Sequence, residues 1–351
     1  MKIVIVGGGV MGCATALSLA GRGAEVVVLE RSVPGAEAST AAAGILGAQV
    51  ESHGPGDHAS ALVAARDAYA GWADALRSRV GIDVGYKRCG VMRVALRESD
   101  VAALSATVDW QAAAGLRAEL LGGEAARSIE PGLSSAVIAA AYFPDDAQVD
   151  PRRLLRALVA AMAREPTVTV RSGESVRGLL TSGERCVGVA TDSGDMHCDA
   201  VVLAAGSWSS LVPGVPASVP AVKPVRGQIV MLDERPPTLR TIVFGAGGYV
   251  VPRGDGLVLC GSTMEHVGYK REVTALGVRD VLATAIALAP ELASAQVEGM
   301  WSSFRPESAS GAPLIGASAM DGLFLATGHH RNGILLARHT AQFVTRAVMG
   351  D

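Results

Sequence analysis

A glycine-rich turn near the start of the chain is the first stretch whose residue types could do chemistry. Gly7-Gly8-Gly9-Val10-Met11-Gly12 has the spacing G-x-G-x-x-G and follows the apolar run from Ile3 to Val6. In this spacing Gly7 permits a tight turn, Gly9 lets backbone approach a pyrophosphate, and Gly12 lets a helix pack close to a sheet. Phosphates would accept hydrogen bonds from free N–H groups at the positive end of that helix. The turn therefore predicts a dinucleotide site.

An acidic residue supports this prediction. Glu30 closes the next apolar strand, Glu25 to Leu29, about twenty residues after the glycines. An acid in this place accepts hydrogen bonds from both hydroxyls of an adenosine ribose, which favours FAD or NAD over NADP. The turn alone does not distinguish FAD from NAD. The alternative is a tight βα turn that binds nothing, but the strand before the turn, the helix after it and the acid at this distance all agree with a dinucleotide site.

Arg305 is a candidate for binding a carboxylate. It lies between a strand predicted over 297–304 and Pro306, so its side chain would be held in one direction. A fixed guanidinium can bind both oxygens of a carboxylate. From the residues alone, a surface ion pair explains Arg305 equally well.

A second glycine turn lies near the end of the chain. A strand over 323–327 ends at Gly328, and a helix is predicted to begin near Asn332. The positive end of that helix could face a ring that gains negative charge, as a flavin does on reduction. His329 and His330 could titrate or bind a metal, but beside such a turn we expect them to form a pocket wall.

Two further segments could contact a cofactor through their backbones. The small residues of 36–46 suit backbone lying flat against a planar ligand, although Ser39 could equally be a helix N-cap. The stretch Ala204 to Trp208 is a glycine turn at the end of a predicted strand, where backbone approaches a cofactor at the carboxyl edge of a sheet.

The elements around these residues fall into two groups. Strands at 3–6, 25–29, 167–170, 187–191 and 200–203, with a helix at 13–20, predict an α/β, Rossmann-like domain. From 228 to 260, short strands and turns indicate an antiparallel sheet on the substrate side. One helix is predicted over 59–80, strands within 84–96 and a loop over 142–146. Another helix is capped by Asp150, with Leu154, Leu158 and Met162 on its buried stripe.

Composition excludes several classes of function. The formal charge of −3 over 351 residues gives no electrostatic reason to expect nucleic acid or an anionic membrane as a partner. Five cysteines without a C-x-x-C pair indicate reduced thiols in the cytoplasm, and argue against disulfides or a zinc site. The uncharged stretch from Ile3 to Gly21 could imitate a membrane span, but its glycines and the following strand argue against one.

Taken together in their order along the chain, five segments resemble the D-amino-acid oxidase family of flavoenzymes, and within it the glycine oxidases of thiamine biosynthesis. They are Gly7 to Gly12 with Glu30, Ser39 to Gly44, Ala205 to Trp208, Arg305-Pro306 with Pro313 to Gly316, and Gly328 to Ala337. The resemblance spans nearly the whole chain. It implies FAD, a discontinuous FAD-binding domain over 1–83, 142–222 and 306–351, and an α+β substrate domain over 84–141 and 223–305.

The resemblance also implies a reaction. Arg305 would bind the substrate carboxylate with the Tyr249 hydroxyl as a second donor, Arg331 would border the same pocket, and Met264 would be part of its wall. Hydride would pass from the substrate α-carbon to flavin N5, leaving an imine, and O2 would be reduced to hydrogen peroxide. No acid–base side chain is required, and no metal is expected.

For the cofactor, the resemblance implies that Glu30 holds the ribose, Val176 lies on the adenine side, and 330–335 surround the flavin ring. The full set of expected FAD contacts is Gly7, Gly9, Val10, Met11, Gly12, Glu30, Arg31, Ser39, Thr40, Ala43, Gly44, Ile45, Val176, Ala205, Gly206, Trp208, His330, Asn332, Gly333, Ile334 and Leu335.

Departures from the family pattern leave the substrate open. Gly247 stands where glycine oxidases can carry a polar side chain, Ser303-Phe304 replaces Gly-Leu before the arginine, and Arg338 replaces a proline. Besides glycine, sarcosine, a D-amino acid or a cyclic imino acid remains an alternative. Two further readings are a dehydrogenase with another electron acceptor and a non-catalytic flavin protein. The resemblance suggests a homo-oligomer and supply of glycine imine for thiazole synthesis.

Overall fold

The apolar first strand is the centre of a six-stranded sheet. All residues, 1–351, are described by the structure, which is a computed structural model. The strands run in the order β18 (Leu314–Ala317), β19 (Leu323–Thr327), β12 (Ala200–Leu203), β1 (Lys2–Val6), β2 (Glu25–Glu30) and β8 (Val168–Ser172). All pairs are parallel except β18 with β19. This is the predicted Rossmann-like sheet.

Alternate residues of β1 face two different cores. Ile3 and Ile5 pack in a cluster with helices α1 (Val10–Ala20), α7 (Pro151–Ala163) and α9 (Gly333–Met349). Val4 and Val6 face the opposite side, where a three-stranded antiparallel sheet of β9 (Val176–Ser182), β10 (Arg185–Thr191) and β11 (Gly194–His197) lies. Side chains alternate between the two faces of a strand, and both faces of β1 are buried. This explains why the apolar run of the strand is uninterrupted.

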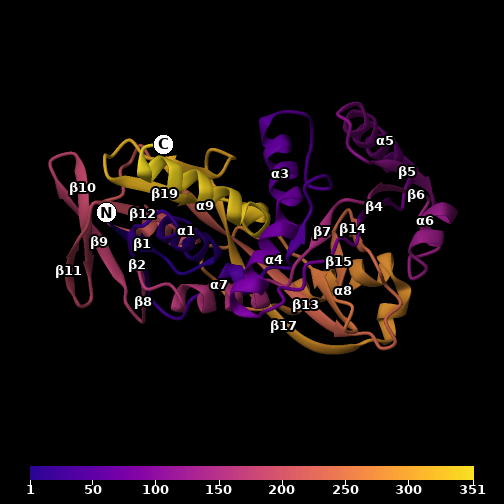
Figure 1. Cartoon of the computed structure of the whole chain (residues 1–351). Helices are drawn as coiled ribbons and strands as arrows, with labels where there is room; N and C mark the ends of the chain where they lie inside the picture. The colour runs from indigo at the N-terminus through magenta and orange to yellow at the C-terminus, as the bar shows by residue number, and fades with distance from the viewer.

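The second large sheet has eight strands and lies at the other end of an elongated molecule (Figure 1). Its order is β17 (Gln296–Ser308), β13 (Val222–Asp233), β16 (Leu257–Gly261), β15 (Gly248–Pro252), β14 (Ile242–Gly245), β4 (Val91–Ala95), β6 (Ala139–Phe143) and β5 (Glu119–Gly122). Helix α8 (Ala275–Leu288) packs on one face and α5 (Glu98–Ala113) on the other. The predicted antiparallel sheet is confirmed apart from β14 and β4, which pair in parallel.

The remaining elements are shorter. They are α2 (Ala38–Ala41), β3 (Ile45–Leu46) paired with β7 (Ala147–Gln148), α3 (Asp57–Asp67), α4 (Tyr69–Val80), α6 (Gly123–Ile129), and the 3-10 helices η1 (Gly206–Leu211), η2 (Pro290–Ser294) and η3 (His330–Asn332). No helix is both long enough and apolar enough to span a bilayer.

The prediction for the α7 region is confirmed in detail. The Asp150 carboxylate accepts hydrogen bonds from the N–H groups of Arg152 (2.9 Å) and Arg153 (3.1 Å). Leu154, Leu158 and Met162 are fully buried. A capped start and one apolar stripe therefore explain why this segment is a helix that packs on the sheet.

Several predicted boundaries are wrong. The helix predicted over 59–80 is interrupted at Ala68, whose carbonyl accepts a hydrogen bond from Arg338 Nη1 at 2.8 Å. The loop predicted over 142–146 begins as strand β6, because Phe143 is fully buried and pairs with Val91. Within 84–96 only β4 forms a strand. Strands β9 and β11 are not among the predicted elements.

The strand predicted to stop at Phe304 continues through Pro306 to Ser308. Pro306 pairs with Pro224 of β13, and β17 is the outermost strand of its sheet. A proline is tolerated there because an edge strand can lack a ladder hydrogen bond. Arg305 is thus held within a strand, and its side chain has a direction set by the pleat.

Candidate functional site

A cavity of about 1250 Å³ is lined by residues of both large sheets. This volume exceeds the ~300–1,000 Å³ of an ordinary small-ligand pocket. The cavity passes the glycine turn after β1, the segment around α2, the turn after β12, the β14–β15 hairpin and the start of α9. It is therefore large enough for a dinucleotide and a small substrate together.

The glycine turn leaves the start of α1 open to a ligand. The N-cap is Gly9, which has no side chain to accept hydrogen bonds from the first turn. Ser39 Oγ accepts one from the Val10 N–H at 2.9 Å, and a Cβ added at Gly9 would contact only that hydroxyl, at 3.2 Å. A Cβ on Gly12 would collide with the Gly7 carbonyl. The turn is thus shaped as a cradle that a side chain would fill.

Glu30 is held at the edge of this cradle. Its Oε2 accepts a hydrogen bond from the Gly8 N–H (2.8 Å), and its Oε1 accepts one from the Ser32 N–H (3.0 Å). The carboxylate lines the cavity and is 9% exposed. Each oxygen keeps a lone pair for a further donor, as ribose hydroxyls require. Beside it, the Arg31 guanidinium lies 4.0 Å from the ring centre of Trp208.

Two orphaned polar atoms mark the opposite part of the cavity. His330 Nε2 and Ser303 Oγ are buried without a hydrogen-bond partner, and both residues line the cavity. His330 also has a φ of 48°, which is uncommon for a residue with a side chain. Because buried polar groups are nearly always paired, these atoms indicate that a ligand supplies the missing partner. The donor and acceptor set of the cavity therefore fits FAD.

Neither histidine near this end is charged at neutral pH. Burial lowers the pKa of His329 to about 3 and that of His330 to about 4. His329 Nε2 lies 2.9 Å from the Thr340 hydroxyl. Both residues line the cavity. No group of three or more His, Cys, Asp or Glu side chains is arranged to hold a metal ion.

Arg305 and Tyr249 both line the cavity, each lying over a glycine. Arg305 Nη1 donates to the Thr263 carbonyl at 3.2 Å, and its Nη2 donates to the Ser262 hydroxyl. Burial lowers the pKa of Arg305, while Tyr249 beside it acts in the opposite direction. Because the hydrogen-bond partners of Arg305 are neutral, carboxylate binding is favoured over the surface ion pair.

Two charged residues of this region were not predicted. Glu51 pairs with Arg331 at 2.7 Å, and Arg93 donates a hydrogen bond to the Val50 carbonyl. All three side chains line the cavity. Neither Glu51 nor Arg93 belongs to a motif, and only the folding of α9 against the segment after β3 brings Glu51 to Arg331.

The cavity collects nearly all of the predicted site residues, and Met264 and Gly247 line it too. The exceptions are Gly12, Thr40 and Leu335. Gly12 lies against Gly7, Thr40 donates its hydroxyl to the Gly35 carbonyl at 2.6 Å, and Leu335 is buried in the core at 1% exposed. These three are not part of the lining, and their direct contact with a cofactor stays a prediction.

Comparisons with known proteins agree with this geometry. A model of the DAO family, described as FAD dependent oxidoreductase, matches residues 2–347. A glycine oxidase from Pseudomonas aeruginosa is 34% identical over 99% of this chain and 95% of its own length. A bifunctional protein ThiO/ThiG from Synechocystis is also 34% identical, and the chain spans about half (51%) of that relative's length.

Solved structures of glycine oxidases are similar to this chain in both fold and sequence. The crystal structure of glycine oxidase from Geobacillus kaustophilus has a TM-score of 0.94 and 33% sequence identity, over 100% of this chain and 95% of the other. That of glycine oxidase from Bacillus cereus has a TM-score of 0.94 and 31% identity, over 99% and 95%.

Proposed function

This chain belongs to the DAO family of FAD-dependent oxidoreductases, and we propose that it catalyses the oxidative deamination of glycine or a similar small amino acid. The observation that carries this proposal is the pairing of Arg305 with Tyr249 in the cavity that also contains the glycine cradle. A carboxylate-binding group is useful there only if the ligand beside the cofactor has a carboxylate.

FAD is the cofactor of this family, and when bound it accepts the hydride that leaves the substrate α-carbon and is reoxidised by O2 to give hydrogen peroxide. We propose that the cradle at 7–12 and Ser39 hold its pyrophosphate. Glu30 would accept hydrogen bonds from the ribose, and Val176 would contact the adenine. His330 and the start of α9 would lie against the ring, where Nε2 would find its missing partner.

The chain's own residues bind and orient the substrate. The Arg305 guanidinium and the Tyr249 hydroxyl would donate to the two carboxylate oxygens, which fixes the direction of the α-carbon. The amine must be neutral for its lone pair to form the imine. The deprotonated fraction of the free amine in solution supplies this form, so no side chain of the cavity has to accept its proton.

A larger or secondary amine is the alternative substrate. Gly247 adds no side chain to the cavity wall, and Met264 in the same wall is 53% exposed, which leaves room beyond glycine. Sarcosine, a D-amino acid or a cyclic imino acid would fit the same carboxylate site.

Other properties are proposed on narrower grounds. A cytoplasmic location is supported by the five free cysteines. A homo-oligomer is supported by the family resemblance alone. We also propose two domains. The first covers 1–83, 142–222 and 306–351, and the second covers 84–141 and 223–305. Every strand of the six-stranded sheet falls in the first set, while β6, β13 and β17 run across boundaries between the sets.

Anaerobic bleaching of the flavin absorbance tests the proposed function. Glycine, sarcosine, D-alanine and D-proline are added separately to the purified holoenzyme, and air is then readmitted. We expect glycine or sarcosine to bleach the flavin, and air to restore the colour with release of peroxide. Bleaching without peroxide on readmission of air would indicate a dehydrogenase. A yellow protein that none of these amines bleaches would contradict the proposal.

A further inference from the structure

The substrate part of the cavity contains two arginines in different electrostatic states. Arg305 has only neutral hydrogen-bond partners. The Arg331 guanidinium, by contrast, has Nη2 2.7 Å from Glu51 Oε1, and the Glu51 side chain is only 11% exposed. Of these two cations, only Arg305 is therefore free of an ion pair and able to bind a carboxylate at full strength.

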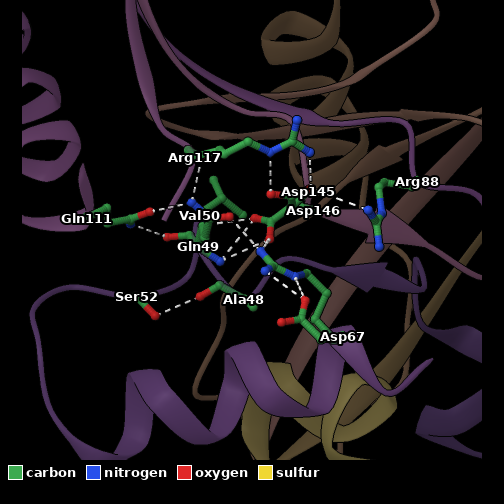
Figure 2. A network of polar contacts seen from close by, with 11 residues as sticks. Ala48, Gln49, Val50, Ser52, Asp67, Arg88, Gln111, Arg117, Asp145 and Asp146 are labelled. Carbon is green, nitrogen blue, oxygen red and sulfur yellow. Dashed lines mark hydrogen bonds and ion pairs between the residues drawn. The ribbon is translucent and has the colours of Figure 1, made fainter. Parts of the chain in front are cut away.

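The segment that carries Glu51 is fixed by a buried carboxylate. Asp146, which is fully buried, accepts hydrogen bonds from the N–H groups of Gln49 (3.1 Å) and Val50 (2.9 Å) (Figure 2). Arg66 of α3, itself 4% exposed, balances this charge with Nη1 3.1 Å from Asp146 Oδ1. Two consecutive backbone groups immediately before Glu51 are thus bound to one rigid anchor.

The Gln49 side chain ties the same segment to two helices. Its Nε2 donates to Gln111 Oε1 of α5 (2.8 Å) and to the Arg117 carbonyl (3.0 Å). Its Oε1 accepts from Arg66 Nη1 (2.6 Å), and its backbone carbonyl accepts from Gln111 Nε2 (2.9 Å). Figure 2 shows Gln49 between Gln111 and Asp146. Every polar group of Gln49 is paired, so the residue before Val50 has little freedom to move.

This anchoring directly affects the cavity. The Val50 carbonyl accepts a hydrogen bond from Arg93, and the Glu51 N–H donates to the Gly47 carbonyl at 3.0 Å. Glu51 also acts at longer range: burial lowers the pKa values of Arg93 and Arg305, and the charge of Glu51 acts in the opposite direction on both. The Glu51 carboxylate is therefore a negative charge that interacts with three arginines of the cavity.

We propose that Glu51 is a specificity-determining residue that limits the pocket to substrates with a single carboxylate, and that Asp146 is the positioning residue that keeps it there. By pairing with Arg331, Glu51 removes a second anion site and would repel a second carboxylate on the substrate. Releasing Arg331 would create a pocket for amino acids with a second acidic group. This inference rests on the proposed function for the natural substrate, but its test measures binding and needs no turnover.

Calorimetric titration of the holoenzyme with acetate, malonate and succinate tests the proposal. The measured quantity is the ratio of two affinities, that for the better-bound dicarboxylate over that for acetate. In Glu51→Gln we expect this ratio to rise about tenfold or more, because one new charge-assisted contact would form. The double variant Glu51→Gln/Arg331→Gln should lose this gain. Asp321→Asn removes one charge from the exposed pair with Arg185 and should leave the ratio unchanged.

Asp146→Asn provides the second variant and the test of positioning. This variant should also raise the affinity for the dicarboxylate relative to acetate, by a smaller factor than Glu51→Gln. A substitution that only weakened the fold would not change this ratio of affinities. An unchanged ratio in Glu51→Gln, or a gain that survives the loss of Arg331, would overturn the proposal. If the wild-type protein binds acetate but no amine bleaches its flavin, the proposed function fails and this inference stands.

Discussion

The guanidinium of Arg305 lies directly over Gly227, so that a Cβ on Gly227 would be 2.7 Å from Arg305 Cζ. The two residues belong to neighbouring strands, β17 and β13. Tyr249 has the same relationship to Gly261 in the adjoining pair β15 and β16, where a Cβ would be 2.7 Å from the Tyr249 hydroxyl. Two glycines in the middle of a sheet thus make room for the two expected carboxylate donors.

Gly227→Ala should displace Arg305 without removing it. The added methyl group would occupy the position of the guanidinium, so we expect KM for glycine to rise about tenfold, while bound FAD is retained. Steady-state kinetics and the flavin absorbance check this. Gly299→Ala in β17 is the matched control, because its Cβ would meet only Met231 Cε at 4.0 Å. Equal KM values for the two variants would contradict the steric argument.

Arg305→Ala should raise KM for amino acids sharply while FAD stays bound. Loss of a charged hydrogen-bond donor costs about 1.5–3 kcal/mol, which corresponds to roughly 10- to 100-fold. The KM of Arg305→Lys should lie between those of wild type and Arg305→Ala, because lysine keeps the positive charge but cannot form the bidentate hydrogen bonds of a guanidinium. Steady-state kinetics with glycine measure this order, and unchanged kinetics would remove Arg305 from the substrate site.

Tyr249→Phe should have a smaller effect on the same constant. It removes one neutral donor, worth about 1 kcal/mol, and keeps the ring that lies over Gly261. We expect KM for glycine to rise roughly fivefold, with thermal stability unchanged. Tyr86→Phe, in a tyrosine that stacks on Tyr69 away from the cavity, is the control. A normal KM in Tyr249→Phe would leave Arg305 as the sole carboxylate donor.

Gly9→Ala should weaken FAD binding and leave the folded apoprotein intact. The new methyl group would contact only Ser39 Oγ within the protein, but it would occupy the space in which we place the pyrophosphate. Overpacking of this kind costs about 1–3 kcal/mol. Fluorescence titration of the apoprotein with FAD measures the loss. Gly54→Ala, where a Cβ meets nothing within 4 Å, is the control.

The sequence predicts the fold well where local pattern and topology agree. The first βαβ unit, the Asp150 cap and the C-terminal strand and helix each have a short-range signal that tertiary contacts reinforce. The helix break at Ala68 has no such signal, because alanine favours helices and the Arg338 side chain that donates to the Ala68 carbonyl is distant in sequence.

The unpredicted cavity residue Glu51 and the residues that anchor its segment depend on contacts between distant parts of the chain. Glu51 meets Arg331 across 280 residues, and Asp146 meets Gln49 across 97. In the sequence, Asp146 stands in what reads as a polar loop, although it is the most buried acid of the network. A carboxylate inside a core is recognisable only after the segment that needs its hydrogen bonds has been placed.

Asp146 should also give stability a distinctive dependence on pH. Burial raises its pKa from 3.8 to about 6, so between these values the folded protein keeps a proton that the unfolded chain releases. The contribution of this group to the free energy of unfolding therefore falls as pH rises through that window, by about 3 kcal/mol in all. Its neighbour Asp145, whose pKa is lowered mainly by Arg117, titrates below the window. Urea unfolding of wild type and Asp146→Asn at fixed FAD concentration measures the difference. We expect wild type minus variant to decrease from pH 4 to 6 and to become level above about pH 6.5, and parallel curves would show that Asp146 is ionised throughout.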